Sequence, residues 1–312
     1  MLIASMLTLT AVALPSNEIR TRGPSGDLHG TFLRAEDPAA PVVLIIPGSG
    51  PTDRDSNNPM GVKAAPYRLL ADGLGANGIS TVRIDKRGMF ASAEAVPDAN
   101  AATIGDYVHD THRWIGTIIE KTQSKCVWLL GHSEGGLVAL AAAQSHEAIC
   151  GVILVATPGR RLGDVKEQLR DNPANAAFLT QAESAIDALA AGERVEAADF
   201  PAPLASLFAP AVQGFLISAF SLDPAKLALS LNKPVLIVQG DRDLQVSMKD
   251  AVLLKAAAPQ AELVRLSNTN HVLKTVQSND PAENIATYSD PSLPLASGVV
   301  AAIVEFLGPQ KQ

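Results

Sequence analysis

The sequence predicts an α/β fold with a mostly parallel central sheet and helices on both of its faces. Apolar runs alternate with helix-like segments along most of the 312 residues, as in parallel β-α-β units whose helices span about 10 to 15 residues. The apolar runs lack polar alternation, which indicates strands buried on both faces. The length suits one large domain that carries an insertion.

The composition excludes several classes of partner. Charged residues make up 18% of the chain and the formal net charge is -7, so no basic stripe is available for a phosphate backbone and we expect no nucleic-acid partner. After the N-terminal leader, no stretch reaches the roughly 18 unbroken apolar residues that a membrane-spanning helix requires. We therefore expect a globular protein without a stable membrane span.

The first fifteen residues have the features of a signal peptide. Leu2 to Leu14 form an apolar run that is too short to cross a bilayer but suits a signal-peptide core, and Ala11 and Ala13 supply an A-x-A cleavage pattern. No Lys or Arg precedes Arg20, so the usual basic start is missing. We expect residues 1–15 to be a signal peptide and the protein to be secreted or periplasmic; the alternative is an apolar N-terminal strand or helix.

The expected elements follow the leader in order. EIRTRGPSGDLHGTFLR, residues 18–34, reads as a β-hairpin around a Gly/Pro turn. Apolar runs that end in Gly, Pro or charged residues predict strands at 41–48, 80–88, 125–131, 149–158, 234–240 and 261–268. Periodic segments, several of them closed by Gly or Pro, predict helices at 66–78, 106–121, 136–146, 247–259 and 296–308. The core therefore comprises residues 16–158 and 232–312.

Residues 159–231 interrupt this alternation. The segment is Ala-rich and mostly helical in pattern, with the Pro clusters FPAPL and FAPAV. It holds five of the eight phenylalanines of the chain: Phe178, Phe200, Phe208, Phe215 and Phe220. We expect it to be a helical insertion that follows the fourth strand of the alternating series.

The hexapeptide GHSEGG, residues 131–136, stands between a predicted buried strand and a predicted helix. G-x-S-x-G is a weak signal alone, but in this context it indicates a nucleophile elbow, a turn so tight that flanking side chains would collide with the sheet or the helix. The turn would hold Ser133 at the C-terminal edge of the sheet. Ser133 is therefore the predicted nucleophile.

A serine hydroxyl needs a general base that is oriented by a carboxylate. In α/β folds with a nucleophile elbow, the catalytic residues occur along the chain in the order Ser, then Asp or Glu, then His. Only His146 and His271 come after Ser133; His146 ends the next helix, a helix length away, so we favour His271. For the acid, two residues follow the strand that ends at Gly240; we favour Asp243, with Val246 anchoring its loop and Asp241 shaping the turn.

Two backbone amides are the predicted oxyanion hole. The N–H of Glu134, directly after the nucleophile, supplies the first. The sequence Gly48-Ser49-Gly50 follows a buried strand and can turn an amide inward, so we select Ser49 for the second, with Gly50 as the alternative. The Glu134 carboxylate is better explained by its place at a helix start than by binding of a substrate amine.

Taken together, GHSEGG, PGSGPTDRD, RIDKRG, GDRDLQV and the later Asn-His pair resemble the α/β-hydrolase superfamily. More narrowly, the chain is similar to its bacterial lidded carboxylesterase and serine-aminopeptidase-like branch, from about Glu18 to the end. The resemblance implies an α/β-hydrolase fold in which residues 159–231 form a lid. It also implies that rings of this lid line an acyl pocket, with Phe178, Phe208, Phe215 and Phe220 as the candidates. The alternative is that these rings form only the core of the lid itself.

The function expected from these residues is hydrolysis of small-molecule carboxylic esters through an acyl-enzyme on Ser133. The chemistry requires no cofactor and no metal ion, and His109 and His112 have no further ligand cluster beside them. A peptidase, an aminopeptidase or an acyltransferase would use the same residues. A non-catalytic ligand-binding member of the fold is a further alternative.

Two other groups of residues allow a structural interpretation. Cys126 and Cys150 open two strands that we expect to be neighbours, so a disulfide between them and a pair of free thiols are both compatible with the sequence. Asp53, Arg54, Asp55 and Arg87 could form a network of ion pairs at the predicted oxyanion loop, or they could be charges exposed to solvent. We expect them, and Arg87 in particular, to brace that loop.

Overall fold

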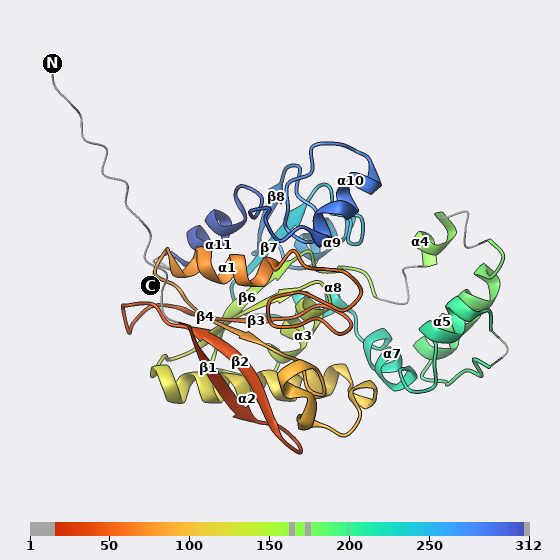
Figure 1. The fold of residues 1–312 in the computed structure, drawn as a ribbon, viewed down its shortest axis with the longest axis horizontal. Coiled ribbons are helices and arrows are strands. Elements are labelled where there is room, and N and C mark those ends of the chain that lie inside the picture. The colour runs from red at the N-terminus through yellow and green to blue at the C-terminus, as the bar shows by residue number, and fades with distance from the viewer. Residues whose placement is uncertain (1–15, 162–165, 172–175, 199, 309–312) are drawn as a thin grey trace.

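The computed structural model describes residues 16–161, 166–171, 176–198 and 200–308 (Figure 1). The predicted signal peptide, residues 1–15, lies outside the described residues. The strands are β1 Ser16–Arg22, β2 Asp27–Leu33, β3 Val42–Ile46, β4 Ser80–Ile84, β5 Val127–His132, β6 Ile149–Val155, β7 Val235–Gly240 and β8 Glu262–Leu266. The helices outside the insertion are α1 Pro66–Gly75, α2 Ile104–Thr122, α3 Glu134–Ala142, α9 Met248–Ala257, α10 Pro281–Ala286 and α11 Val299–Leu307.

All eight strands form a single sheet in the order β1-β2-β4-β3-β5-β6-β7-β8. The N-terminal hairpin β1–β2 is antiparallel and joins β4 in antiparallel register, whereas every pair from β4 to β8 is parallel. This confirms the predicted fold class, including the hairpin. Parallel strands bring their C-terminal ends to one edge of the sheet, and loops at that edge are available to build a site.

The apolar strands are buried because helices cover both faces of the sheet. Successive residues of β3 point to opposite faces: Leu44 packs into a cluster with α2 and α3, while Val43 and Ile45 pack into a second cluster with α1 and α11. Figure 1 shows α1 and α11 on one side of the sheet and α2 on the other. This two-sided burial explains why the strand sequences are apolar throughout rather than alternating.

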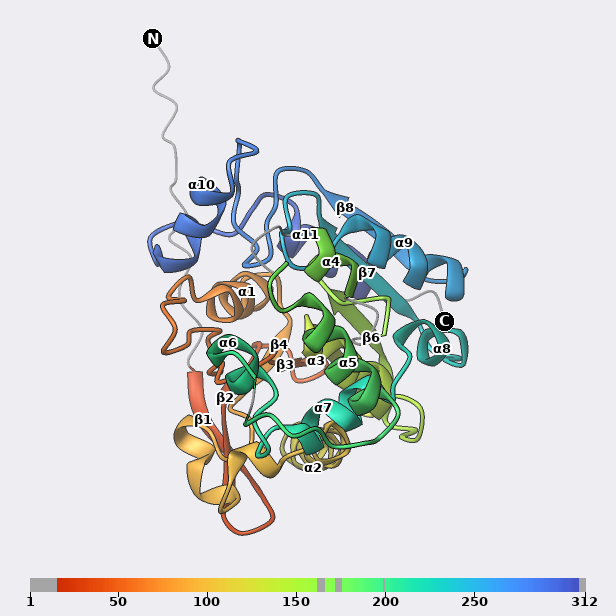
Figure 2. The ribbon, with the colours of Figure 1, turned by 90° about the vertical axis from the view of Figure 1, so that its right-hand side faces the viewer.

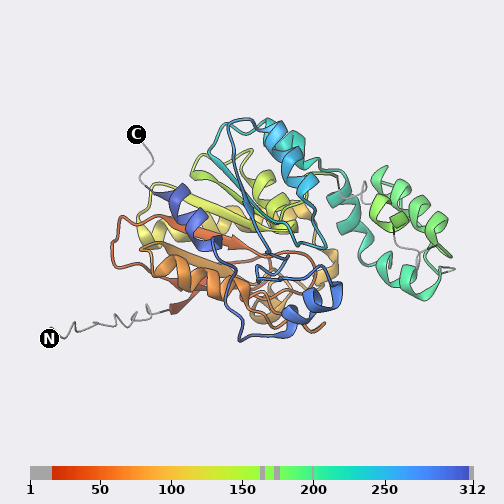
Figure 3. The same ribbon diagram turned by 90° about the horizontal axis from the view of Figure 1, so that it is seen from above.

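The insertion between β6 and β7 contains α4 Lys166–Asp171, α5 Leu179–Ala190, α6 Ala202–Leu207, α7 Gln213–Phe220 and α8 Pro224–Leu229. Figure 2 looks onto this segment, with α5 and α7 in front of the strands, and Figure 3 shows α5 extending away from the sheet. Buried residues of α5 and α6, Leu189 and Leu204 among them, form a separate apolar cluster. The described part of the insertion thus has a small core of its own.

In the part of the chain that the structure describes, the helices are too short or too polar to cross a bilayer.

Cys126 and Cys150 are joined by a disulfide, with their Cα atoms 5.2 Å apart. Cys126 directly precedes β5 and Cys150 is the second residue of β6, and these strands pair in parallel. Their starts therefore lie side by side, which resolves the choice that the sequence left open in favour of the bridge.

Replacement of both cysteines, Cys126→Ala with Cys150→Ala, is expected to lower the free energy of unfolding by about 3 kcal/mol, because the bridge closes a loop across a separation of 24 residues in the unfolded chain. Urea unfolding of the variant and the wild type measures the difference. A reductant should destabilise the wild type and leave the variant unchanged. Equal stability of the variant and of the oxidised wild type would contradict a stabilising bridge.

Candidate active site

Ser133 occupies the sharp turn between β5 and α3. Its backbone has φ 53° and ψ -123°, a left-handed φ that is uncommon for a residue with a Cβ and typical of strained functional turns. The Ser133 N–H donates a hydrogen bond of 2.9 Å to the Val155 carbonyl at the end of β6. The turn therefore holds the serine at the C-terminal edge of the sheet, as the elbow geometry requires.

The glycines of GHSEGG are required by close backbone approach. A Cβ at Gly131 would lie 2.2 Å from the Gly135 carbonyl oxygen, and a Cβ at Gly135 would lie 2.3 Å from the Ile46 carbonyl oxygen. Both distances are far below van der Waals contact, and both obstacles are backbone atoms. Side chains at these positions would push the helix off the strand and displace Ser133 with it.

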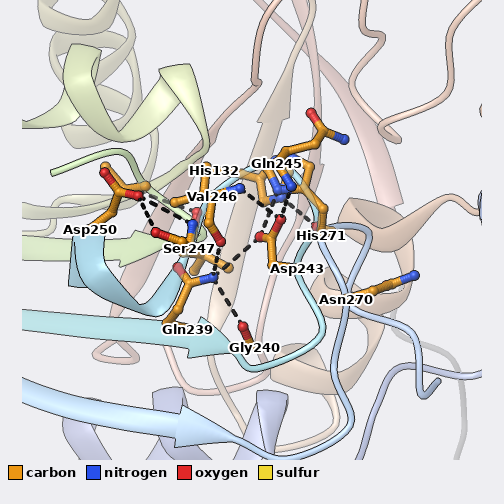
Figure 4. A network of polar contacts seen from close by, with 12 residues as sticks. His132, Gln239, Gly240, Asp243, Gln245, Val246, Ser247, Asp250, Asn270 and His271 are labelled. Atoms are coloured by element: carbon orange, nitrogen blue, oxygen red, sulfur yellow. Dashed lines mark hydrogen bonds and ion pairs between the residues drawn. The ribbon is translucent and has the colours of Figure 1, made fainter. Parts of the chain in front are cut away.

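His271 and Asp243 form a buried pair at the same edge of the sheet (Figure 4). The distance between His271 Nδ1 and Asp243 Oδ2 is 2.8 Å, with side chains 6% and 1% exposed. When Nδ1 donates to the carboxylate, Nε2 of a neutral imidazole keeps its lone pair and can act as a base. Ser133 and His271 line one cavity, so the structure brings together the three residues predicted from the sequence.

The loop after β7 holds the Asp243 carboxylate in place. Its Oδ1 accepts hydrogen bonds from the N–H groups of Gln245 and Val246, at 2.8 and 2.9 Å. Burial raises the pKa of Asp243, but the His271 ring and these amide donors outweigh it, and the pKa lies below its usual value. The carboxylate is therefore ionised throughout the neutral range and orients the imidazole.

Asp241 does not contact His271. Its Oδ1 accepts the Asn268 N–H at 2.7 Å, and its Oδ2 pairs with Arg265 at 3.2 Å. The carboxylate thereby ties the end of β7 to the chain that leaves β8. This agrees with a structural role for Asp241, although its shortest contact is with Asn268, after β8, and not within its own turn.

Sequence reasoning missed the role of His132, the residue before the nucleophile. His132 Nε2 donates to the His271 carbonyl at 2.9 Å, so Nδ1 is the acceptor for the Tyr67 hydroxyl at 2.8 Å. Tyr67 Oη in turn accepts the Gly48 N–H at 3.0 Å. Burial and the neighbouring His271 ring lower the pKa of His132 to about 3, so this ring stays neutral and the chain of hydrogen bonds keeps one direction.

This chain of hydrogen bonds links the loop after β3 to the loop that carries His271. The only sequence signal for His132 was a polar residue at the end of an otherwise apolar strand. Tyr67 gave none, since an aromatic residue in a helix is normally part of the core.

Ser49, in the loop after β3, and Glu134, the residue after Ser133, are the two predicted oxyanion donors. Both residues line a cavity that Ser133 also lines. Glu134 is the first residue of α3, where a backbone N–H has no partner within the helix. The Glu134 carboxylate is buried and lies 3.6 Å from the Lys86 ammonium, which agrees with a structural role for this side chain.

Two cavities meet at Ser133. The first, of about 320 Å³, is lined by His271 and by residues of the loop after β3, including Ser56, Asn58 and Met60. The second, of about 460 Å³, lacks His271 and has a mainly apolar wall: Leu137, Pro158, Ala219, Pro224, Leu244 and Val246. Ala219 and Pro224 belong to α7 and α8, so the insertion contributes to the second cavity.

The predicted pocket residues lie elsewhere. Phe178, Phe208 and Phe220 pack in the apolar cluster of the insertion itself, and Phe215 packs against the main core, with its ring 6.3 Å from that of Tyr107. None of the four lines either cavity at Ser133. The described contacts thus favour the alternative interpretation for Phe178, Phe208 and Phe220, in which large rings form the core of a small helical segment, while the smaller Ala219 and Pro224 line the second cavity.

Of the charged residues expected to brace the loop after β3, Arg54 does so and Arg87 does not. Arg54 binds Asp85 at 2.6 Å and so braces this loop against the end of β4. Arg87 instead binds Asp110 at 2.6 Å and Asp106 at 2.7 Å on α2. The expectation that Arg87 braces the loop is therefore wrong, because its side chain extends toward the helix.

His146 and His112, two further histidines considered from the sequence, pack against each other. His146 stacks beside His112, with ring centroids 4.8 Å apart, and lines neither cavity at Ser133. Within the described residues, no group of three or more His, Cys, Asp or Glu side chains is arranged to hold a metal ion.

The sheet order, the elbow and the buried His-Asp pair define a protein with the α/β-hydrolase fold. Solved structures with this architecture include the α/β hydrolase GrgF from Penicillium sp. sh18, with a TM-score of 0.58 and 21% identity over 83% of this chain and 91% of that one. Est1E from Butyrivibrio proteoclasticus has a TM-score of 0.56 and 15% identity over 93% and 98% of the two chains. These likenesses show the fold.

The family model described as serine aminopeptidase, S33, matches residues 60–275, which is more than half of the chain. The protein therefore belongs to the serine aminopeptidase S33 family of α/β-hydrolases. Among curated proteins, it is 27% identical over 239 residues to esterase EstD from Thermotoga maritima. That match covers 75% of this chain and 54% of the relative, so the chain spans about half the length of EstD.

Proposed function

We propose that the protein hydrolyses small carboxylic esters through an acyl-enzyme on Ser133. The observation that carries the proposal is the buried His271–Asp243 pair, 2.8 Å between Nδ1 and Oδ2, beside the cavity that Ser133 lines. Ser133 Oγ attacks the ester carbonyl while His271 Nε2 accepts its proton. The N–H groups of Ser49 and Glu134 stabilise the oxyanion, His271 returns the proton to the leaving alcohol, and water then releases the acid.

The proton transfer indicates which part of the ester occupies each of the two cavities. The leaving oxygen must lie within reach of His271 Nε2, so the alcohol occupies the cavity that His271 lines. The acyl group then extends into the other cavity, whose wall is mainly apolar and includes Leu137 and Leu244. Burial of an apolar chain against such a wall is favourable in proportion to its area. Esters with an apolar acyl group are therefore the preferred substrates.

The charges of the acyl cavity favour an ester over the amino-terminal peptide of an aminopeptidase. The charged residues that line this cavity are Glu134, Asp250 and Arg160, so its two acidic residues are Glu134 and Asp250. The first faces Lys86 at 3.6 Å and the second binds Arg160 at 2.9 Å. Each is already paired with a cation inside the protein, so neither is suited to bind the α-ammonium group of a peptide.

We also propose a secreted or periplasmic location. Its support is the apolar run from Leu2 to Leu14 and the disulfide between Cys126 and Cys150, since structural disulfides persist mainly in oxidising compartments.

The acyl assignment is tested with p-nitrophenyl acetate, butanoate and octanoate, with alanine p-nitroanilide as the amide. The wild type should hydrolyse the esters in preference to the amide. Leu244→Trp should narrow the acyl cavity and lower the octanoate-to-acetate ratio of kcat/KM by about tenfold or more, the effect of a few methylene groups that no longer fit. Leu244 is 52% exposed, so the larger ring should not prevent folding.

Met60→Trp is the matched control. Met60 is also exposed, at 74%, but it lines the alcohol cavity, so this variant should keep the wild-type octanoate-to-acetate ratio. If Met60→Trp changed that ratio and Leu244→Trp did not, the two cavities would be assigned the wrong way round. Preference for the amide over every ester would contradict the proposed function.

A further inference from the structure

Lys86 is a buried cation directly behind the loop that carries Ser49. It lies two residues after β4, and its side chain is only 5% exposed. The ammonium donates a hydrogen bond of 2.7 Å to the Gly48 carbonyl, lies 3.6 Å from Glu134 Oε1 and stands 5.3 Å from the centre of the Tyr107 ring. Its shortest contact is thus with the backbone of the loop and not with its counter-ion.

Gly48 is held on both sides. Its N–H donates to Tyr67 Oη at 3.0 Å, and its carbonyl accepts from Lys86. A Cβ added at Gly48 would lie 3.4 Å from the Ser133 Cβ, so this residue runs directly alongside the nucleophile. The next peptide unit, which contains the Gly48 carbonyl and the Ser49 N–H, therefore has one end fixed beside the reacting hydroxyl.

A trans peptide directs its C=O and N–H in opposite directions, and the described residues contain no cis peptide bond. Because the Gly48 carbonyl points toward the buried Lys86 ammonium, the Ser49 N–H of the same peptide points away from Lys86, and Ser49 lines both cavities at Ser133. Rotation of this peptide would turn a carbonyl oxygen toward the developing negative charge, which would repel it. The orientation of one peptide therefore decides whether the second oxyanion donor exists.

We propose that Lys86 is a positioning residue for the oxyanion hole. By anchoring the Gly48 carbonyl it orients the Ser49 N–H, and Glu134 is its buried counter-ion. The inference rests on the proposed hydrolase function. A buried ion pair is a weak source of stability compared with apolar side chains of the same volume, so a purely structural role would not require it. In this proposal Glu134 has two roles: its N–H is one oxyanion donor, and its carboxylate balances the cation that positions the other donor, the Ser49 N–H.

The test uses Lys86→Met, Glu134→Gln and the double variant. Lys86→Met removes the anchor, and kcat/KM should fall by about 10² to 10³, the usual effect of losing one oxyanion donor, mainly in kcat with KM little changed. This variant also leaves the Glu134 carboxylate buried without a cation and should be less stable. Lys86→Met with Glu134→Gln removes that charge, so its stability should recover while its kcat stays low.

Glu134→Gln alone keeps the Lys86 contact with Gly48 and should lose less activity than Lys86→Met. A boronic acid that mimics the tetrahedral intermediate should bind the double variant more weakly by the same factor as the fall in kcat/KM. Octanamide, a neutral analogue that carries no negative charge on oxygen, should bind to both proteins with nearly equal affinity. Activity within threefold of the wild type in the double variant, or a loss confined to KM, would overturn the proposal.

A crystal structure of the double variant provides a readout that does not depend on turnover. A rotated or disordered Gly48–Ser49 peptide supports the anchoring role of Lys86, and an unchanged peptide overturns it. Failure of the hydrolase function is recognised separately, because a fluorophosphonate probe would then fail to label Ser133 in the wild type. In that case the crystal structure still decides whether Lys86 orients this peptide.

Discussion

Ser133→Ala is expected to lower kcat for p-nitrophenyl esters by about 10⁴ to 10⁶, because it removes the atom that forms the acyl-enzyme. The residual rate would come from the oxyanion donors and from substrate binding. Alanine keeps the Cβ at the position with φ 53°, so the strain of the elbow is the same in both proteins and the fold should be retained.

Steady-state hydrolysis of p-nitrophenyl butanoate measures this loss, and circular dichroism and thermal unfolding verify that the variant is folded. A fluorophosphonate probe should label the wild type and not the variant. If Ser133→Ala kept more than a tenth of the wild-type rate, or were labelled equally, the nucleophile would be a different residue.

Asp243→Asn is expected to lower kcat by about 10⁴, the second largest effect. The asparagine amide can present an N–H to His271 Nδ1, which favours the tautomer with its proton on Nε2 and leaves no lone pair toward Ser133. KM should change little, since Asp243 lines neither cavity at Ser133.

Asp241→Asn is the matched control for this variant. Asp241 is two residues away, yet its carboxylate binds Asn268 and Arg265 rather than His271, so its replacement should alter kcat by only a few-fold. Equal losses from the two variants would mean that the loop after β7 is merely disturbed, and would contradict the assignment of Asp243 as the acid.

The lowered pKa of Asp243 also has a consequence for stability. A carboxyl group whose pKa is lower in the folded state stabilises the fold above its unfolded value of about 3.9 and loses this contribution as the pH falls through the folded value. Urea unfolding between pH 7 and pH 3 should therefore show a smaller acid dependence for Asp243→Asn than for the wild type. The same series with Asp241→Asn provides the comparison.

Sequence patterns alone predicted the framework of the fold. Strands that are buried on both faces are apolar at every position, and helices that cover them carry an apolar residue every three to four positions. Both patterns can be recognised in a short stretch of sequence. The same locality explains why GHSEGG could be interpreted: the close approach of Gly131 and Gly135 to neighbouring backbone atoms restricts the residues that the turn tolerates. Asp243 and His271 could be selected because each follows a strand and the strands are parallel.

Only the tertiary structure decided which side chains of the insertion face the site and which charged groups pair. The sequence shows that Phe208 and Phe220 are large apolar residues of the insertion, but it does not show which residues they contact, and they pack within the insertion. Arg87 and Lys86 lie next to each other in the sequence, yet the first extends to α2 and the second to the Gly48 carbonyl. Such contacts join segments far apart in the chain, so their energy depends on distances that local sequence does not encode.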